Sequence, residues 1–277
     1  MVHTRPIPRQ GISWRKVVLE GQVPAVGEYV AAAAGDSPFA PLEPLANGVA
    51  LPGRIPAWWW PGVPQEQEIP FSHRVLFRHE HFLVAFKPHF LPTTSNGRLV
   101  VNTLQTRLRV QEDNPHVTPL HRLDVLTAGV VVCSTNPTTR GVYQRLFQTP
   151  GLVRKTYQAE LSQPWSGPVG EVELPMMKRA GDPQVRVHDD GVVTKTFVER
   201  CSPYHLRLSP VTGHTHQLRV LCNHFGSPIR GDDTYPVVRG RDLYDFSQPL
   251  LLVATTLEFD DPCAPRFSDS RCSFRAE

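Results

Sequence analysis

The 277-residue sequence predicts an α+β fold: a mixed, largely antiparallel sheet with flanking helices and a central basic cleft, preceded by a small, irregular N-terminal appendage. Three observations predict this class. Short apolar segments with strand-like alternation recur from His73 onward. Few segments have helical spacing, and those few do not alternate regularly with the strands. The 28 prolines disfavour long uninterrupted helices.

The appendage is expected to span residues 1–70, which are rich in proline and poor in regular patterns. Its one predicted helix covers residues 23–34, where a run of alanines ends at Gly35. Trp58, Trp59 and Trp60 can either stack on bases or pack against the main domain, and packing is the commoner role of such a cluster. Residues 71–277 are expected to form the main domain.

The main domain begins with a predicted hairpin, in which residues 75–78 and 82–86 flank a short charged turn. Lys87 and Pro88 end its second strand. Residues 128–134 form a nearly continuous apolar strand, typical of a buried position. Further strands are predicted at residues 156–161, 192–199, 204–208 and 250–259.

Three helices are predicted between these strands. The first covers residues 102–110, and the second runs from Asn136, as its cap, to about Gln148. The third covers residues 216–225, with apolar residues at positions i, i+3, i+4 and i+7. Thr215 is its expected cap and Gly226 its expected stop.

Composition argues against several classes of protein. Hydrophobic residues make up 40% of the chain and charged residues 20%, as in ordinary globular proteins. No apolar run approaches the ~18 residues of a membrane span, and the basic start has no apolar segment behind it, so we expect a cytoplasmic protein without membrane contact. The five cysteines are widely spaced and contain no CxxC pair, which indicates neither a disulfide framework nor a cysteine zinc site.

Positive charge is concentrated in the middle of the chain, although the net charge is only +3. Between Arg98 and Lys155 there are eight basic residues and three acidic ones. Most basic residues of the chain are arginines, whose planar guanidinium suits contact with phosphates. A genome rich in G and C explains an arginine bias equally well, so this feature alone does not identify a nucleic-acid-binding protein.

Four segments concentrate polar residues beside apolar structure. Asp124 lies in the first, just before the apolar strand at residues 128–134, where a carboxylate can be directed into a cleft. Taken alone, it fits a turn or cap aspartate better. The segments are HRLDVLTAG (121–129), RKTYQAEL (154–161), TGHTHQLRV (212–220) and GSPIRGDDTY (226–235).

Together these segments resemble the RluA-type family of RNA pseudouridine synthases, over about residues 73–262. HRLD followed by Thr127 and Gly129 is similar to the family's HRLDxxTSG, and KTYQA is similar to its KxYxA element. THQLRV and GSPIRGDDTY resemble the family's third block. Two positions depart from the pattern: Ala128 replaces the usual serine, and His214 replaces the usual arginine.

The resemblance implies a cofactor-free, metal-free isomerase that converts specific uridines of ribosomal or transfer RNA to pseudouridine, with a catalytic domain at residues 71–277. Asp124 would be the nucleophile, Tyr157 the flat surface for the flipped-out base, and Arg219 the counter-charge that keeps the carboxylate ionised. The appendage is then a candidate for a degenerate RNA-binding extension, and a monomer is expected. Further RNA contacts are assigned to Arg122, Lys87, Lys155, His214 and His216.

Two other functions are compatible with parts of the sequence. A non-catalytic RNA-binding relative is one, although nothing structural requires Asp124, Tyr157 and Arg219 together. A zinc hydrolase using His214, His216, Cys222 and His224 is the other. The spacing of this second set argues against a metal site, because metal-binding helices prefer ligands at i and i+4.

Overall fold

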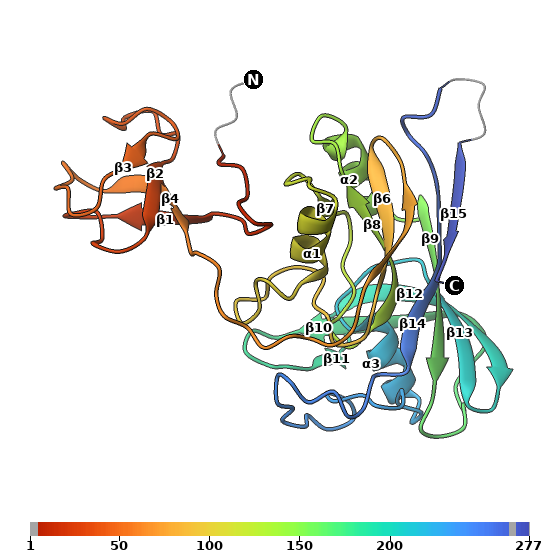
Figure 1. Cartoon of the computed structure of the whole chain (residues 1–277). Coiled ribbons are helices and arrows are strands. Elements are labelled where there is room, and N and C mark those ends of the chain that lie inside the picture. Colours follow the sequence, from red (N-terminus) through yellow and green to blue (C-terminus); the bar gives the residue numbers. More distant parts are fainter. Residues whose placement is uncertain (1–4, 266–269, 277) are drawn as a thin grey trace. The chain divides into compact units, whose positions relative to one another are not determined.

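The computed structural model describes residues 5–265 and 270–276. The described chain divides into two compact units (Figure 1). Residues up to Glu66 form the first unit together with Thr94–Val117, and the second comprises Gln67–Thr93 and the residues from Thr118 onward. The first unit is therefore discontinuous in sequence, which the expected boundary near residue 70 did not anticipate.

The first unit contains a four-stranded antiparallel sheet in the order β1-β4-β2-β3, drawn in red and orange in Figure 1. Its core includes Leu19, Val23, Leu45 and Ile55. Residues 1–70 thus carry a sheet with a small core of its own, and the expectation of an irregular appendage is wrong. The strands are β1 (Arg15–Leu19), β2 (Glu28–Ala31), β3 (Pro44–Leu45) and β4 (Ile55–Trp60).

The helix predicted at residues 23–34 does not form. Part of that segment is β2, and Ala31 lies fully buried opposite Ala57 of β4. The helix propensity of alanine is weak enough for this packing between strands to override it. Trp58, Trp59 and Trp60 form the end of β4, between β1 and β2.

Helix α1 (Leu104–Gln111) completes the first unit. Its N-terminus is fixed by Thr103, whose hydroxyl accepts a hydrogen bond from the backbone N–H of Thr106 at 3.1 Å. On the buried side, Arg109 donates to the carbonyl of Gly11 at 3.0 Å and to the hydroxyl of Ser13 at 2.8 Å. The early chain and the helix are therefore joined by buried polar contacts.

The second unit contains the larger sheet, whose main path runs β11-β10-β12-β13-β9-β14-β8-β6-β5, with β15 paired to β14 and β7 paired to β8. The strand pairs are antiparallel except β14 and β8, which are parallel, so the predicted mixed, largely antiparallel sheet is confirmed. The strands are β5 (Arg74–Arg78), β6 (Phe82–Lys87), β7 (Thr118–Pro119), β8 (Ala128–Ser134), β9 (Val153–Glu160), β10 (Gly170–Lys178), β11 (Val185–Val187), β12 (Val192–Ser202), β13 (His205–Pro210), β14 (Leu252–Asp260) and β15 (Arg271–Arg275).

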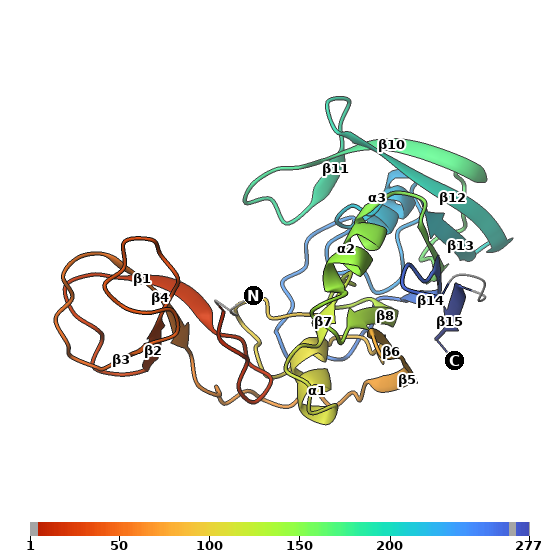
Figure 2. The same cartoon turned by 90° about the horizontal axis from the view of Figure 1, so that it is seen from above.

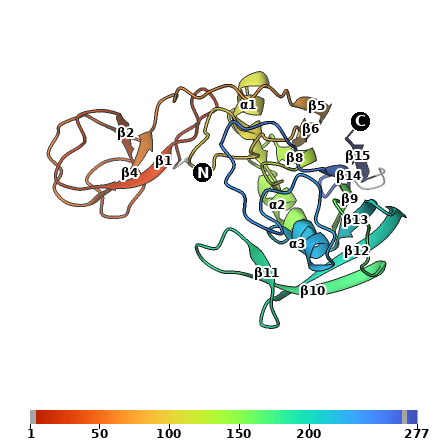
Figure 3. The ribbon, with the colours of Figure 1, turned by 90° about the horizontal axis from the view of Figure 1, so that it is seen from below.

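Two helices accompany this sheet. The buried Tyr143 and Leu146 of α2 (Arg140–Gln148) pack on Phe82 of β6 and Val130 of β8, which closes a core on one side of the sheet. Helix α3 (Gln217–His224) lies beside β11, as Figures 2 and 3 both show. Because α3 carries the end of the polar segment TGHTHQLRV (212–220), this position places that segment beside β11.

Both helices begin later than predicted. The side chain of Asn136 accepts a hydrogen bond from the backbone N–H of Thr138 at 3.0 Å, which makes a turn before α2 begins at Arg140. At α3 the expected cap, Thr215, is wrong: His216 occupies the cap position with φ of 57°, and its side chain makes no capping hydrogen bond. This left-handed backbone is rare for a residue other than glycine and is often found at functional sites.

Gly129, the last residue of the HRLDVLTAG segment, permits the close contact between the parallel strands. It has φ of +130°, and a Cβ atom there would lie 2.3 Å from the carbonyl oxygen of Ala254 on β14. No side chain fits in this space. Glycine at this position therefore lets β14 lie against β8, the strand into which the Asp124 loop leads.

We expect Gly129→Ala to lower the free energy of unfolding by about 3 kcal/mol or more, because a backbone clash adds to the strain of a positive φ. Gly181→Ala is the matched control, since Gly181 has φ of +79° but nothing within 4 Å of the place that a Cβ atom would take. It should cost only ~1 kcal/mol. Urea unfolding measures both values, and equal losses would contradict the steric explanation.

Candidate active site

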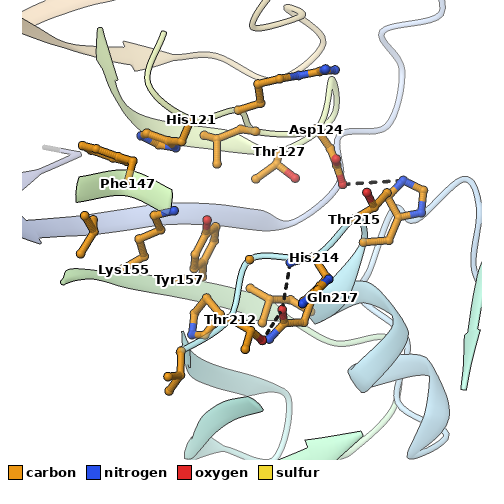
Figure 4. Close-up of a pocket in the computed structure, with 18 of the residues that line it drawn as sticks. His121, Asp124, Thr127, Phe147, Lys155, Tyr157, Thr212, His214, Thr215 and Gln217 are labelled. Carbon is orange, nitrogen blue, oxygen red and sulfur yellow. Dashed lines mark hydrogen bonds and ion pairs between the residues drawn. The ribbon is translucent and has the colours of Figure 1, made fainter. Parts of the chain in front are cut away.

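A cavity of about 850 Å³ lies in the second unit. Its wall is formed by three of the four polar segments singled out in the sequence, together with the end of α2 (Figure 4). Asp124, Tyr157 and Arg219 all line it. The residues expected to carry the chemistry therefore meet in one hollow, although they are up to 95 positions apart in the chain.

Asp124 lies in the loop between β7 and β8. The residue before it is clamped by Thr93, whose hydroxyl accepts from the backbone N–H of Leu123 at 3.1 Å and donates to its carbonyl at 2.9 Å. After it, the N–H of Thr127 donates to the Asp124 carbonyl at 3.1 Å. The backbone on both sides is thus fixed, and the carboxylate points toward the start of α3 (Figure 4).

Arg219 faces that carboxylate from α3, with 3.3 Å between its Nη1 and Oδ2 of Asp124. The guanidinium is almost completely buried and is held by two further carboxylates. Asp232 accepts from Nε at 2.8 Å and from Nη2 at 2.7 Å, and Asp233 accepts from Nη2 at 3.0 Å. Burial alone would lower the pKa of Arg219, but the hydrogen bonds and charge of Asp232, with the charges of Asp124 and Asp233, raise it on balance.

His216, the residue with the left-handed backbone before α3, also lines the site. Its Nδ1 lies 3.1 Å from the hydroxyl of Tyr235, and its Nε2 lies 4.0 Å from Oδ2 of Asp124. Burial lowers the pKa of His216, while the charge of Asp124 acts in the opposite direction. The imidazole is therefore predominantly neutral at pH 7, and it faces the carboxylate.

Tyr157 and Lys155 lie on β9, two residues apart and on the same face of the strand. Burial raises the pKa of Tyr157, and the charge of Asp124 raises it further, so the phenol stays neutral. The ammonium of Lys155 lies 5.7 Å from the ring centroid of Phe147, which itself stacks on His121. Tyr157 thus separates the Asp124 end of the cavity from the Phe147 end (Figure 4).

Lys87 requires a correction, because it does not line the cavity as an RNA contact. It is fully buried, and its ammonium donates to the carbonyls of Pro88, Leu91 and Val125 at 2.7–3.2 Å. Burial lowers the pKa of Lys87 to about 7, and the negative charge of Asp124 opposes that shift. Through its hydrogen bond to the carbonyl of Val125, Lys87 supports the loop that carries Asp124.

Arg122 and His214 are exposed and lie on the wall of the cavity. The backbone N–H of His214 donates to Oε1 of Gln217 at 3.1 Å, so this loop is held even though the His214 side chain is exposed to solvent. Gln217 also donates from Nε2 to the carbonyl of Lys195 on β12. The loop before α3 is therefore tied to the sheet through Gln217.

Sequence reasoning did not assign Asp232, Asp233, Tyr235 and Thr93 to the site. The first three lie in GSPIRGDDTY, a segment whose motif suggested no roles for its individual side chains. The adjacent acidic pair was a usable signal, because buried arginines need carboxylate partners. Thr93 had no signal, since its role depends on the fold alone.

Among the described residues, no group of three or more His, Cys, Asp or Glu side chains is arranged to hold a metal ion. Cys222, from the zinc alternative, is fully buried on α3, and burial raises the pKa of its thiol. In the same described part, no helix is both long and apolar enough to cross a membrane.

Comparison with known proteins identifies the family. Residues 81–224 match the family model of RNA pseudouridylate synthase. The chain belongs to this family. Among curated relatives, the dual-specificity RNA pseudouridine synthase RluA of Vibrio parahaemolyticus is 31% identical over 68% of this chain and 78% of its own length. The ribosomal large subunit pseudouridine synthase C of Escherichia coli is 29% identical over 58% of this chain and 52% of its own length.

Solved structures agree with the fold of this RluA-type synthase. Human RNA pseudouridylate synthase domain containing 4 matches with a TM-score of 0.55 and 23% identity, over 74% of this chain and 88% of its own. Human RNA pseudouridylate synthase domain containing 1 matches with a TM-score of 0.54 and 23% identity, over 77% of this chain and 93% of its own. The family match and the curated relatives confirm the resemblance inferred from the motifs, and the protein is an isomerase of the pseudouridine synthase type.

We expect Asp232→Asn to lower the free energy of unfolding by about 3 kcal/mol, because it leaves the buried guanidinium without its bidentate partner. Asp233→Asn is the control, since Asp233 is partly exposed and makes one hydrogen bond to Arg219, and it should cost ~1 kcal/mol. Urea unfolding of both variants measures the difference. A larger loss for Asp233→Asn would contradict the ranking.

The buried Lys87 predicts a pH dependence of stability. Between pH 7 and 10.5 the unfolded chain holds a proton on Lys87 that the folded protein has released, so stability rises with pH across this window. Relative to Lys87→Met, the unfolding free energy of the wild type should rise by up to about 1.4 kcal/mol per pH unit. Urea titrations at pH 7 to 9.5 check this, with the surface variant Lys178→Met as reference. A flat difference would contradict it.

Proposed function

We propose that this protein converts specific uridines of ribosomal or transfer RNA to pseudouridine, with Asp124 as nucleophile and no cofactor or metal. One observation carries the proposal: the Asp124 carboxylate lies in the cavity 3.3 Å from a buried guanidinium, beside the ring of Tyr157. The guanidinium favours the ionised carboxylate, which is the nucleophilic form.

The reaction needs little more than this set of groups. The bond between C1′ of the ribose and N1 of uracil breaks, the base turns, and C1′ bonds to C5. N1 gains a proton and C5 loses one, so the conversion is balanced without an oxidant or a reductant. Asp124 attacks either the anomeric carbon or the uracil ring, and both routes use the same pocket.

Tyr157 suits the turning step. A flat ring holds a base by stacking, worth ~1–3 kcal/mol, without fixing its rotation in the plane. A neutral phenol adds no charge beside Asp124. The cost of extracting a nucleotide from its stack is also a few kcal/mol, so stacking on Tyr157 offsets much of it.

Basic residues around the cavity support RNA as the substrate. Arg122 and His214 are exposed on its wall, with Lys155 and His216 deeper inside. The relatives are named as dual-specificity and large-subunit synthases, and by analogy we assign this chain an RNA of either class. We further propose that it acts as a cytoplasmic monomer and that the first unit is an extension that adds RNA contacts to those of the catalytic second unit.

Asp124→Asn tests the nucleophile. The amide keeps the size of the side chain but cannot form the covalent intermediate, so turnover should fall by ~10⁴-fold or more. Pseudouridine formation on total RNA from cells that lack the gene measures this, while thermal melting and RNA binding should change little. The surface variant Asp242→Asn is the control, and turnover of Asp124→Asn within tenfold of it would refute the assignment.

The target is found by mapping pseudouridines in cells with and without the gene. A position that disappears with the gene, and returns when the wild-type but not the Asp124→Asn protein is supplied, identifies the RNA and the uridine. An unchanged map would argue against both proposed RNA classes.

A further inference from the structure

The end of the cavity away from Asp124 contains a second group of side chains that the proposed chemistry does not use. Lys155, Phe147 and His121 gather there, with Tyr157 between them and Asp124 (Figure 4). Phe147 and His121 stack almost in parallel, 5.1 Å apart with 8° between their planes. The ammonium of Lys155 lies 5.7 Å from the centroid of Phe147.

Lys155 is partly buried, and it has no anionic partner within the described residues. Burial alone lowers its pKa, and no carboxylate opposes the shift. This distinguishes it from Arg219, which three carboxylates surround. A sequestered ammonium without a partner is unfavourable, and an anion that enters the cavity relieves that cost.

His121 adds no negative charge to the same wall, and its Nδ1 is buried. Its Nε2 accepts the backbone N–H of Val132 at 3.2 Å, which leaves the proton on Nδ1, and Nδ1 finds no acceptor in the part of the chain described. Burial, together with the charge of Lys155, holds the pKa of His121 well below its usual range, so the ring is neutral. Of the residues that the structure describes, Asp124 is the one acidic residue lining the cavity, and it lies at the other end.

From this arrangement we propose that Lys155 binds the phosphodiester that joins the reacting uridine to its neighbour in the RNA, with Phe147 and His121 as the rigid wall that holds the ammonium in place. The inference rests on the proposed function and names a subsite for it. Two residues along β9 span ~6.6 Å, so a base held against Tyr157 has its adjacent backbone within reach of Lys155.

A double-mutant cycle between protein and RNA tests the contact. The probe is a stem-loop carrying the mapped uridine, made with native linkages or with a neutral methylphosphonate on the 5′ or the 3′ side of that uridine. All proteins carry Asp124→Asn, so that the RNA is not converted. Lys155→Met and the neutral linkage on one side should each weaken Kd by about tenfold, and together by no more than either alone.

Controls separate this contact from general attraction. Arg154→Met removes an exposed charge from the adjacent position of β9, and its effect should add to that of the neutral linkage. Lys155→Arg should restore most of the affinity, and Lys155→Met should reduce the slope of log K against log salt by about 0.7. The proposal is overturned if the loss of affinity from Lys155→Met adds to that of the neutral linkage on both the 5′ and the 3′ side. It is also overturned if Lys155→Met leaves Kd unchanged.

The same stem-loop distinguishes this inference from the proposed function. If wild-type protein converts the uridine while the cycle is additive, only the phosphate contact fails. If wild-type protein does not convert it, the proposed function fails instead. Thermal melting of Lys155→Met checks that the variant is folded, and Lys155→Gln provides a second neutral side chain.

Discussion

The active site depends on one buried ion pair, between Arg219 and Asp232. Asp232 takes two of the guanidinium nitrogens, which fixes the plane of Arg219 and leaves Nη1 directed at Asp124. The contact to Asp124 is the longest of the four, so Arg219 is not a simple partner of that carboxylate. It is a fixed positive charge, placed by Asp232, beside which Asp124 stays ionised while still open to the cavity. Removing the anchor therefore affects both stability and chemistry.

The sheet determines where that charge can act. Asp124 lies in the loop that leads into β8, and β8 is held against β14 by the close approach at Gly129. On the other side of β14, β9 carries Tyr157 in register with Ala254. The same residue of β14 thus borders both Gly129 and Tyr157. This shared neighbour links the loop of the carboxylate to the strand of the phenol.

Much of the second unit could be predicted from local sequence. Short apolar runs located the hairpin at β5 and β6 and the strand at β8, whose residues are all buried, because a strand covered on both faces is apolar throughout. The motifs indicated that Asp124, Tyr157 and Arg219 share one cavity. The motifs could not show how deeply a side chain is buried. In the sequence, Lys87 at the end of a strand looks like a surface lysine. Only the three carbonyls around its ammonium show that it is internal.

The first unit was the hardest part to predict, and its layout has a consequence for how the protein can be divided. Because Thr94–Val117 belongs with the residues before Glu66, the chain leaves this unit and returns to it. The first unit therefore cannot be added or removed by gene fusion at a single junction. Cutting near residue 70 would remove the two acceptors that Gly11 and Ser13 offer to the buried Arg109 of α1, although the Nε of Arg109 would still donate to the carbonyl of Val117. An engineer who wants a minimal enzyme must excise two segments or neither.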